Sequence, residues 1–74
     1  MTDRQTAILD ALRHGPLDQV QIAAAIRVAP FNIKDDLRAL RRDRYLRARF
    51  NGRDLWELTS RGHAATQSPS LGFW

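Results

Sequence analysis

The stretch from Gln21 to Leu46 constrains the fold most, because its apolar residues keep a helical period on both sides of one proline. After this proline, Ile33, Leu37 and Leu40 recur at intervals of four and three residues, which places them in one stripe of an α-helix. Pro30 cannot continue a helix but suits the first position of a new one. The stretch therefore predicts two short helices joined by a tight corner, the second leading into a strand. The apolar residues of the first helix and corner are Ile22, Ala23, Ile26 and Val28.

Local signals predict where the other helices begin and end. Thr2 with Gln5, and Asp18 with Gln21, have the spacing of capping boxes at the starts of two helices. The first of these helices ends at His14-Gly15-Pro16, because Gly15 can take a left-handed cap and Pro16 blocks continuation. The later helices are predicted at Gln19–Arg27, Pro30–Asp43 and Ser60–Thr66, the last capped by Thr59, and Leu17-Asp18 can add one residue pair to a small sheet.

Residues 45–58 predict a β-hairpin with Asn51-Gly52 as its turn signal. A two-residue turn would mix apolar and charged side chains on both faces of the hairpin. We therefore expect a three-residue loop over 50–52 with Gly52 left-handed, since a buried face fixes strand register. In this register Leu46 pairs with Trp56 and Ala48 with Asp54. One face of the hairpin then carries Leu46, Ala48, Trp56 and Leu58, and we expect Trp56 to lie in the core. The other face carries Arg47, Arg49, Arg53 and Glu57.

This order of elements resembles the winged helix-turn-helix domains of DNA-binding regulators. The resemblance covers roughly Thr6 to Ala65, and the run from Leu58 to Gly62 is similar to the L-T-x-x-G that follows the hairpin, or wing, in bacterial members. It implies a mainly α fold with a small β-hairpin (α+β): three helices, the wing and a short C-terminal helix. We assign residues 1–66 to this domain and residues 67–74 to a C-terminal tail. The implied function is sequence-specific binding of double-stranded DNA by a small bacterial or phage transcription regulator.

The charge distribution agrees with a polyanionic partner. The chain of 74 residues has a net charge of +4, and the segment Arg38–Arg53 alone carries seven arginines against one acid, Asp43. That segment therefore has a charge of +6 and the rest of the chain −2, so one end of the domain is a basic patch.

In the family, the helix after the corner enters the major groove and reads base edges with its exposed side. A turn of about 100° per residue puts Phe31, Asp35, Arg38 and Arg42 opposite the buried stripe. Asn can pair with adenine, Arg with guanine, Asp with the cytosine amino group, and Phe can contact a thymine methyl. Arginines further along the helix and on the wing suit phosphates. The candidate DNA-binding residues are Phe31, Asn32, Lys34, Asp35, Arg38, Arg41 and Arg42 on the helix, and Arg47, Arg49, Phe50 and Arg53 on the wing.

Two adjacent carboxylates oppose the DNA interpretation, because carboxylates repel phosphate. Asp35 lies on the exposed side, where it could instead pair with Arg38 three residues later. By helical angle Asp36 lies at the edge of the buried side, where we expect it to face the helix before the corner. These acids and an apolar tail support the alternative function, a winged-helix protein–protein interaction module.

Three residues depart from the family pattern. Arg27 stands where a corner glycine is usual, Ala29 where a capping Ser or Thr is common, and Arg44 where a glycine often ends the helix. We therefore expect the corner at Arg27 to be built differently from the usual turn. Arg27 and Arg44 also add positive charge beside the basic patch.

Other classes of protein find little support in the sequence. There is no cysteine, His14 and His63 stand alone, and no nucleophile with a base or phosphate-binding glycine loop is visible, so we expect no metal, no cofactor and no enzyme. No apolar run approaches the ~20 residues of a membrane span, and no signal-peptide pattern is present, so we expect a cytoplasmic protein. One small module makes few base contacts, so we expect a homodimer on two half-sites. Leu71, Phe73 and Trp74 of the tail are expected to pack on a neighbouring subunit or on the first helix.

Overall fold

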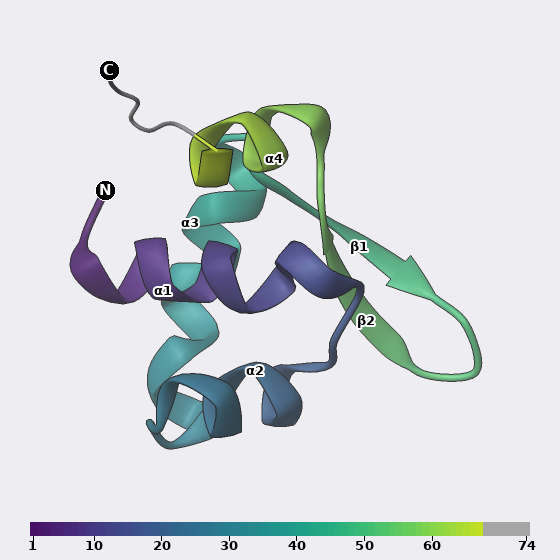
Figure 1. Ribbon diagram of the computed structural model, residues 1–74. Helices are drawn as coiled ribbons and strands as arrows, with labels where there is room; N and C mark the ends of the chain where they lie inside the picture. The colour runs from purple at the N-terminus through teal and green to yellow at the C-terminus, as the bar shows by residue number, and fades with distance from the viewer. Residues whose placement is uncertain (68–74) are drawn as a thin grey trace.

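Within residues 1–67, four α-helices surround a small core and a two-stranded antiparallel hairpin extends from it (Figure 1). This architecture confirms the predicted α+β class. The computed structural model describes residues 1–67, so the predictions for Leu71, Phe73 and Trp74 lie outside the described residues. The elements in order are α1 (Asp3–Ala11), the 3-10 helix η1 (Leu12–His14), α2 (Gln19–Ile26), the 3-10 helix η2 (Pro30–Ile33), α3 (Lys34–Arg42), β1 (Leu46–Phe50), β2 (Asp54–Leu58) and α4 (Ser60–Gln67).

Both predicted capping boxes are present at the starts of α1 and α2. Gln5 N donates to Thr2 Oγ1 at 3.1 Å, and Thr2 N donates back to Gln5 Oε1 at 3.2 Å. Asp18 and Gln21 exchange the same two bonds, at 2.7 and 3.0 Å. Each box satisfies two amides that the start of a helix leaves without an intrahelical partner. The first helix ends before Gly15, as predicted, but Gly15 does not take the left-handed cap, because its φ of 142° and ψ of 174° lie outside the left-handed helical region.

The core forms where the apolar stripe of the third helix meets α1. Ile33, Leu37 and Leu40 are at most 2% exposed, as their spacing predicted. Figure 1 shows α1 lying across α3, and α1 also contacts α2 and α4. The buried apolar residues are Ile8, Leu9, Leu12, Ile22, Ala23, Ile33, Leu37, Leu40, Leu46 and Leu58.

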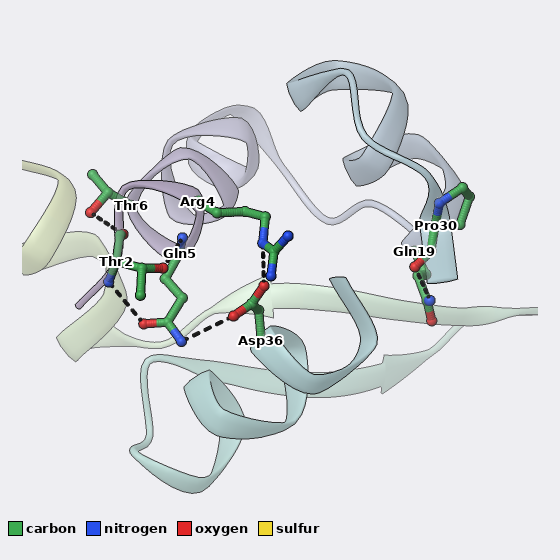
Figure 2. Close-up of polar contacts among 7 residues, drawn as sticks. All are labelled: Thr2, Arg4, Gln5, Thr6, Gln19, Pro30 and Asp36. Carbon is green, nitrogen blue, oxygen red and sulfur yellow. Dashed lines mark hydrogen bonds and ion pairs between the residues drawn. The ribbon is translucent and has the colours of Figure 1, made fainter. Parts of the chain in front are cut away.

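One carboxylate is buried in this contact between helices. Asp36 is 9% exposed and accepts hydrogen bonds from Arg4 Nε at 2.6 Å and Gln5 Nε2 at 3.2 Å (Figure 2). The expectation that Asp36 faces the helix before the corner is therefore wrong, because both partners belong to α1. A carboxylate removed from water requires donors, and a guanidinium is the strongest that a protein offers. Asp36 thus links α3 to α1 by charge as well as by apolar contact.

The hairpin has a three-residue loop, as predicted, but its strands pair in another register. Leu46 pairs with Leu58 and Ala48 with Trp56, so the loop begins one residue later than predicted. The predicted pairs, Leu46 with Trp56 and Ala48 with Asp54, are wrong by two residues. Because two residues are the side-chain period of a strand, the apolar residues still share one face.

Contacts outside the hairpin loop explain the observed register. Leu46 and Leu58 are buried directly opposite each other at the base of the hairpin, at 2% and 6% exposure. Leu17 exchanges backbone hydrogen bonds with Trp56 at 3.1 and 2.8 Å, which confirms the residue pair expected from this segment. Trp56 is half-buried and packs against the core, and Gly52 has the predicted left-handed conformation, with φ 77°. Burial at the base therefore decides the register.

The third helix starts as a 3-10 helix, where the sequence predicted an α-helix from Pro30. The α-helical segment begins only at Lys34. Without a side-chain cap, the first turn tightens, and Asn32 N donates to the carbonyl three residues earlier at 2.9 Å. Gln19 in α2 holds this turn in place, since its Nε2 donates to the Pro30 carbonyl at 2.6 Å (Figure 2).

Arginines close α2 and α3 in a left-handed backbone conformation. Arg27 has φ 62° and ψ 44°, and Arg44 has φ 69°. After Arg27, Val28 N donates to the Ala23 carbonyl at 3.0 Å, the wide bond of a Schellman motif. The expectation that this corner differs from the usual turn is therefore wrong, because Arg27 adopts the conformation that glycine would supply.

Gly62 allows α4 to pack closely on the junction between α3 and β1. A Cβ atom at Gly62 would overlap the carbonyl oxygen of Tyr45 and lie 3.0 Å from a methyl of Leu58. The Gly62 amide donates to Thr59 Oγ1 at 3.1 Å, which confirms Thr59 as the cap of the last helix. The glycine that weakens α4 as a helix is thus required by its close approach to the backbone.

We predict that Gly62→Ala lowers the melting temperature, although alanine favours a helix by about 1 kcal/mol. The added methyl must displace backbone, and overpacking of this kind destabilises by about 1–3 kcal/mol. Thermal unfolding followed by circular dichroism measures the change. His63→Ala, at an exposed position of the same helix, is the control and should shift stability by less than about 0.5 kcal/mol. A higher melting temperature for Gly62→Ala would contradict the close approach of α4 to Tyr45.

Candidate nucleic-acid interface

The outward side of η2 and α3 carries the side chains predicted to read bases. Pro30 and buried Ile33 fix the first turn, so that Phe31 projects outward with 83% of its surface exposed. Further along, burial of Leu37 and Leu40 turns the intervening polar side chains away from the core. We call this the reading side; its members, all exposed, are Phe31, Asn32, Lys34, Asp35, Arg38, Arg41 and Arg42.

Most cations of the reading side have no internal partner. Within residues 1–67, Lys34, Arg38 and Arg41 form no ion pair, and Arg42 has only a 3.8 Å contact with the adjacent Asp43. Asp35 and Arg38, which the sequence allowed to pair, form no ion pair with each other in residues 1–67. A guanidinium has five N–H donors and no acceptor, so these groups remain available to an external acceptor.

The two adjacent carboxylates of α3 have opposite environments. Asp36 is turned into the contact with α1, where Arg4 neutralises it. Asp35 is exposed on the reading side. An exposed carboxylate repels phosphate but can accept a hydrogen bond from an amino group such as cytosine N4. The burial of Asp36 leaves the reading side more positive than the sequence of α3 suggests.

Acidic side chains pair with the wing arginines, which the sequence interpretation missed. Arg47 Nε and Arg49 Nη1 both donate to Glu57, the latter at 3.0 Å, and the Glu57 side chain is only 12% exposed. Arg53 lies in the loop, not on the predicted strand face, and its Nη1 is 3.1 Å from Asp18 Oδ2. The shared hairpin face was a signal for the Glu57 pairs. No sequence signal marked the pair of Arg53 with Asp18, because the fold brings these distant residues together.

The pairing changes the acidity of Glu57. Two hydrogen bonds lower the pKa of the Glu57 carboxyl below its ordinary value of 4.5, and the bond from Arg47 has a larger effect than the bond from Arg49. A lowered pKa means that the carboxylate stabilises the fold above that ordinary value and loses this effect as pH falls through the lowered pKa. At neutral pH Glu57 is therefore charged and competes with external anions for both guanidinium groups.

A shallow hollow of about 380 Å³ joins the wing to α3. Arg41 from α3 and Arg49 from β1 both border it, and Phe50 borders it at the end of β1 with 74% of its surface exposed. Arg47 lies elsewhere, bordering a second hollow together with Arg44, Arg61 and His63. The structure thus brings Arg41, Arg49 and Phe50 together at one hollow, whereas Arg47 shares the Glu57 carboxylate with Arg49 but does not border that hollow.

In the part of the chain that the structure describes, residues 1–67, no group of three histidine or acidic side chains gathers where it could hold a metal ion. None of its helices combines the length and the apolar character required to cross a membrane.

Solved structures of bacterial proteins share this fold, although no protein-family model and no curated protein matches the chain. MepR, a transcription regulator of the Staphylococcus aureus multidrug efflux pump MepA, is 24% identical with a TM-score of 0.82, over 90% of this chain and 53% of MepR. A mutant of ZitR from Lactococcus lactis is 21% identical with a TM-score of 0.83, over 90% of this chain and 49% of ZitR. The M. tuberculosis transcriptional regulator MosR is 30% identical with a TM-score of 0.74, over 90% of this chain and 51% of MosR. The chain spans about half the length of these structures.

We predict that Glu57→Gln strengthens binding to a polyanion such as heparin. Removing the carboxylate frees Arg47 and Arg49 while nearly preserving side-chain shape. The variant should elute from a heparin column at a clearly higher salt concentration than the unchanged chain. Asp54→Asn removes the same charge from the same strand without disturbing either arginine pair, and should cause a smaller shift. Equal shifts would mean that Glu57 does not restrict the two arginines.

Proposed function

We propose that this chain, which has the winged helix-turn-helix fold of bacterial transcription regulators, binds double-stranded DNA sequence-specifically and regulates transcription. One observation carries the proposal. The reading side presents Lys34, Arg38 and Arg41 without an ion pair in residues 1–67, while Asp36 on the same helix is buried against α1. Free guanidinium groups on an exposed helix suit both phosphate and guanine. The proposed role is that of a binding protein and not of an enzyme.

In this proposal, the first part of the reading side contacts base edges in the major groove. Arg38 donates two hydrogen bonds to guanine, and Asn32 pairs with adenine. Phe31 contacts a thymine methyl, and its high exposure supports this role. Asp35 accepts from a cytosine amino group and disfavours bases that present only acceptors. Lys34 adds a charged donor beside them.

The other candidate residues hold the DNA backbone. Arg41 and Arg42 lie later in α3, and Arg41 shares a hollow with Arg49 of the wing. For Arg47 and Arg49, a phosphate replaces Glu57 as the acceptor; for Arg53, it replaces Asp18. Phosphate contacts of this kind fix orientation on the duplex without reading sequence. Phe50 at the tip of the wing lies against the sugar edge of the minor groove.

A homodimer is part of the proposal, because α3 alone spans few base pairs. Two copies on half-sites about one helical turn apart would double the contacts and add specificity. The exposed carboxylate of Asp35 favours a second candidate, a protein-interaction module, since a carboxylate on the reading side weakens attraction to phosphate. The two candidates differ in how binding depends on salt.

Binding to random duplex DNA should weaken steeply as salt rises. Each phosphate neutralised by an arginine releases about 0.9 counterion, so log affinity should fall linearly with log salt with a slope near −0.9 for every contact made. Fluorescence anisotropy with a labelled duplex at several salt concentrations measures the slope. Absence of binding at low salt, or a flat salt dependence, would remove the DNA proposal in favour of the interaction module.

Arg38→Ala should relax preference at one base pair. On a duplex selected from a random library, we expect a loss of about 1–3 kcal/mol, with little change on random DNA. Arg49→Ala is the matched comparison and should weaken binding to both duplexes alike, since the wing contacts phosphates in this proposal. Equal losses on both duplexes for Arg38→Ala would mean that Arg38 holds the backbone instead of reading a base.

A further inference from the structure

Arg27 and Arg44 share a backbone state that arginine rarely adopts. Their φ angles of 62° and 69° are the positive values recorded for non-glycine residues within the described part of the chain. Each ends a helix, α2 or α3, through the same pair of bonds. After Arg44, Tyr45 N donates to the Leu40 carbonyl at 2.9 Å, while Arg44 N donates to Arg41 at 3.0 Å. Both sites are therefore Schellman closures, where glycine is the usual residue.

The left-handed state is unfavourable for arginine, because its Cβ crowds the carbonyl that follows. Glycine has no such crowding, and asparagine tolerates it better than longer side chains. A strained residue persists when something else favours it.

Within residues 1–67, neither side chain makes a polar interaction that would offset the backbone strain. Both are exposed, and within those residues neither side chain takes part in a hydrogen bond or an ion pair. Arg44 borders a hollow that is also lined by Arg47, Arg61 and His63, and no acidic side chain lines it.

The positions of the two arginines suggest what compensates for the strain. Arg27 precedes Pro30 and so lies where the reading side begins, and Arg44 follows Arg42, where α3 ends. Figure 1 shows the two ends of the third helix well separated, with the corner after α2 at one end and the junction with β1 at the other. The backbone positions of Arg27 and Arg44 therefore lie at opposite ends of the third helix, within side-chain reach of a rigid polyanion that extends past both ends.

We propose that Arg27 and Arg44 are phosphate ligands that bracket α3 on the DNA backbone, an inference that rests on the proposed function. Neither was among the residues that the helical spacing selected. The Schellman bonds fix the backbone at both points, so binding orders only the arginine side chain and not the chain segment that carries it. In this proposal, the contact of each arginine with a DNA phosphate compensates for the backbone strain that the free protein carries.

The test is to remove strain and charge together. In Arg27→Gly and Arg44→Gly the melting temperature should rise by a few degrees, while affinity for random duplex DNA should fall several-fold. The salt slope should fall in magnitude by about 0.9 for each substitution. Arg27→Asn and Arg44→Asn provide the same test without the added flexibility of glycine in the unfolded chain. Arg27→Lys and Arg44→Lys keep the charge and should retain most of the affinity and slope.

Arg13→Gln is the control for a change of one charge, because Arg13 is exposed in η1 and pairs with Asp10 away from α3. If the Gly and Asn variants at a position lose no more affinity than Arg13→Gln, the arginine at that position is not a phosphate ligand. The inference is also wrong at a position where both variants lower the melting temperature, since the arginine would then stabilise the fold itself. Absence of salt-dependent binding by the unchanged chain would instead overturn the proposed function, which separates the two failures.

Discussion

Packing of the third helix against α1 is the contact on which the rest of the structure depends. Ile33, Leu37 and Leu40 bury one side of that helix, and Asp36 at the edge of the same side bonds to α1. Once this side is buried, the opposite side must face solvent, because a helix repeats every 3.6 residues. The reading side is thus a consequence of core formation. A helix rotated about its axis would exchange apolar and charged residues and lose both the core and the exposed cations of the reading side.

Acidic residues decide which arginines remain available, and they act on three different elements. Asp36 is neutralised within the core contact, Glu57 holds two wing arginines, and Asp18 holds the arginine in the wing loop. Surface ion pairs contribute little to stability, so the pairs on the wing matter more for the arrangement of charge. Within residues 1–67, Lys34, Arg38 and Arg41 of the third helix form no ion pair, and neither do Arg27 and Arg44 at its two ends. Positive charge that appears continuous along the sequence is therefore uneven on the folded surface.

Close backbone contacts set the geometry at both ends of α3. At one end, Gln19 bonds to the Pro30 carbonyl and fixes the first turn. At the other, Gly62 packs against the Tyr45 carbonyl, and Thr59 Oγ1 donates to the Arg44 carbonyl at 2.6 Å. Thr59 thereby holds the backbone of the Schellman closure at Arg44, and Gln19 holds the turn that follows the closure at Arg27. The orientation of α3 relative to the wing follows from the same contacts.

Residues within a few positions of one another set the N-terminal caps of α1, α2 and α4, the buried stripe and the apolar face of the hairpin, so the sequence predicted these features. Spacing thus predicted the exposure of Phe31 and Arg38 and the burial of Leu37. Tertiary structure alone decided the hairpin register, the partner of Asp36 and the pairing of Arg53 with Asp18. A shift of two residues leaves every side chain on the same face, so patterning cannot detect it. Ion pairs between distant segments depend on how whole elements are oriented, and that orientation exists only once the core has formed.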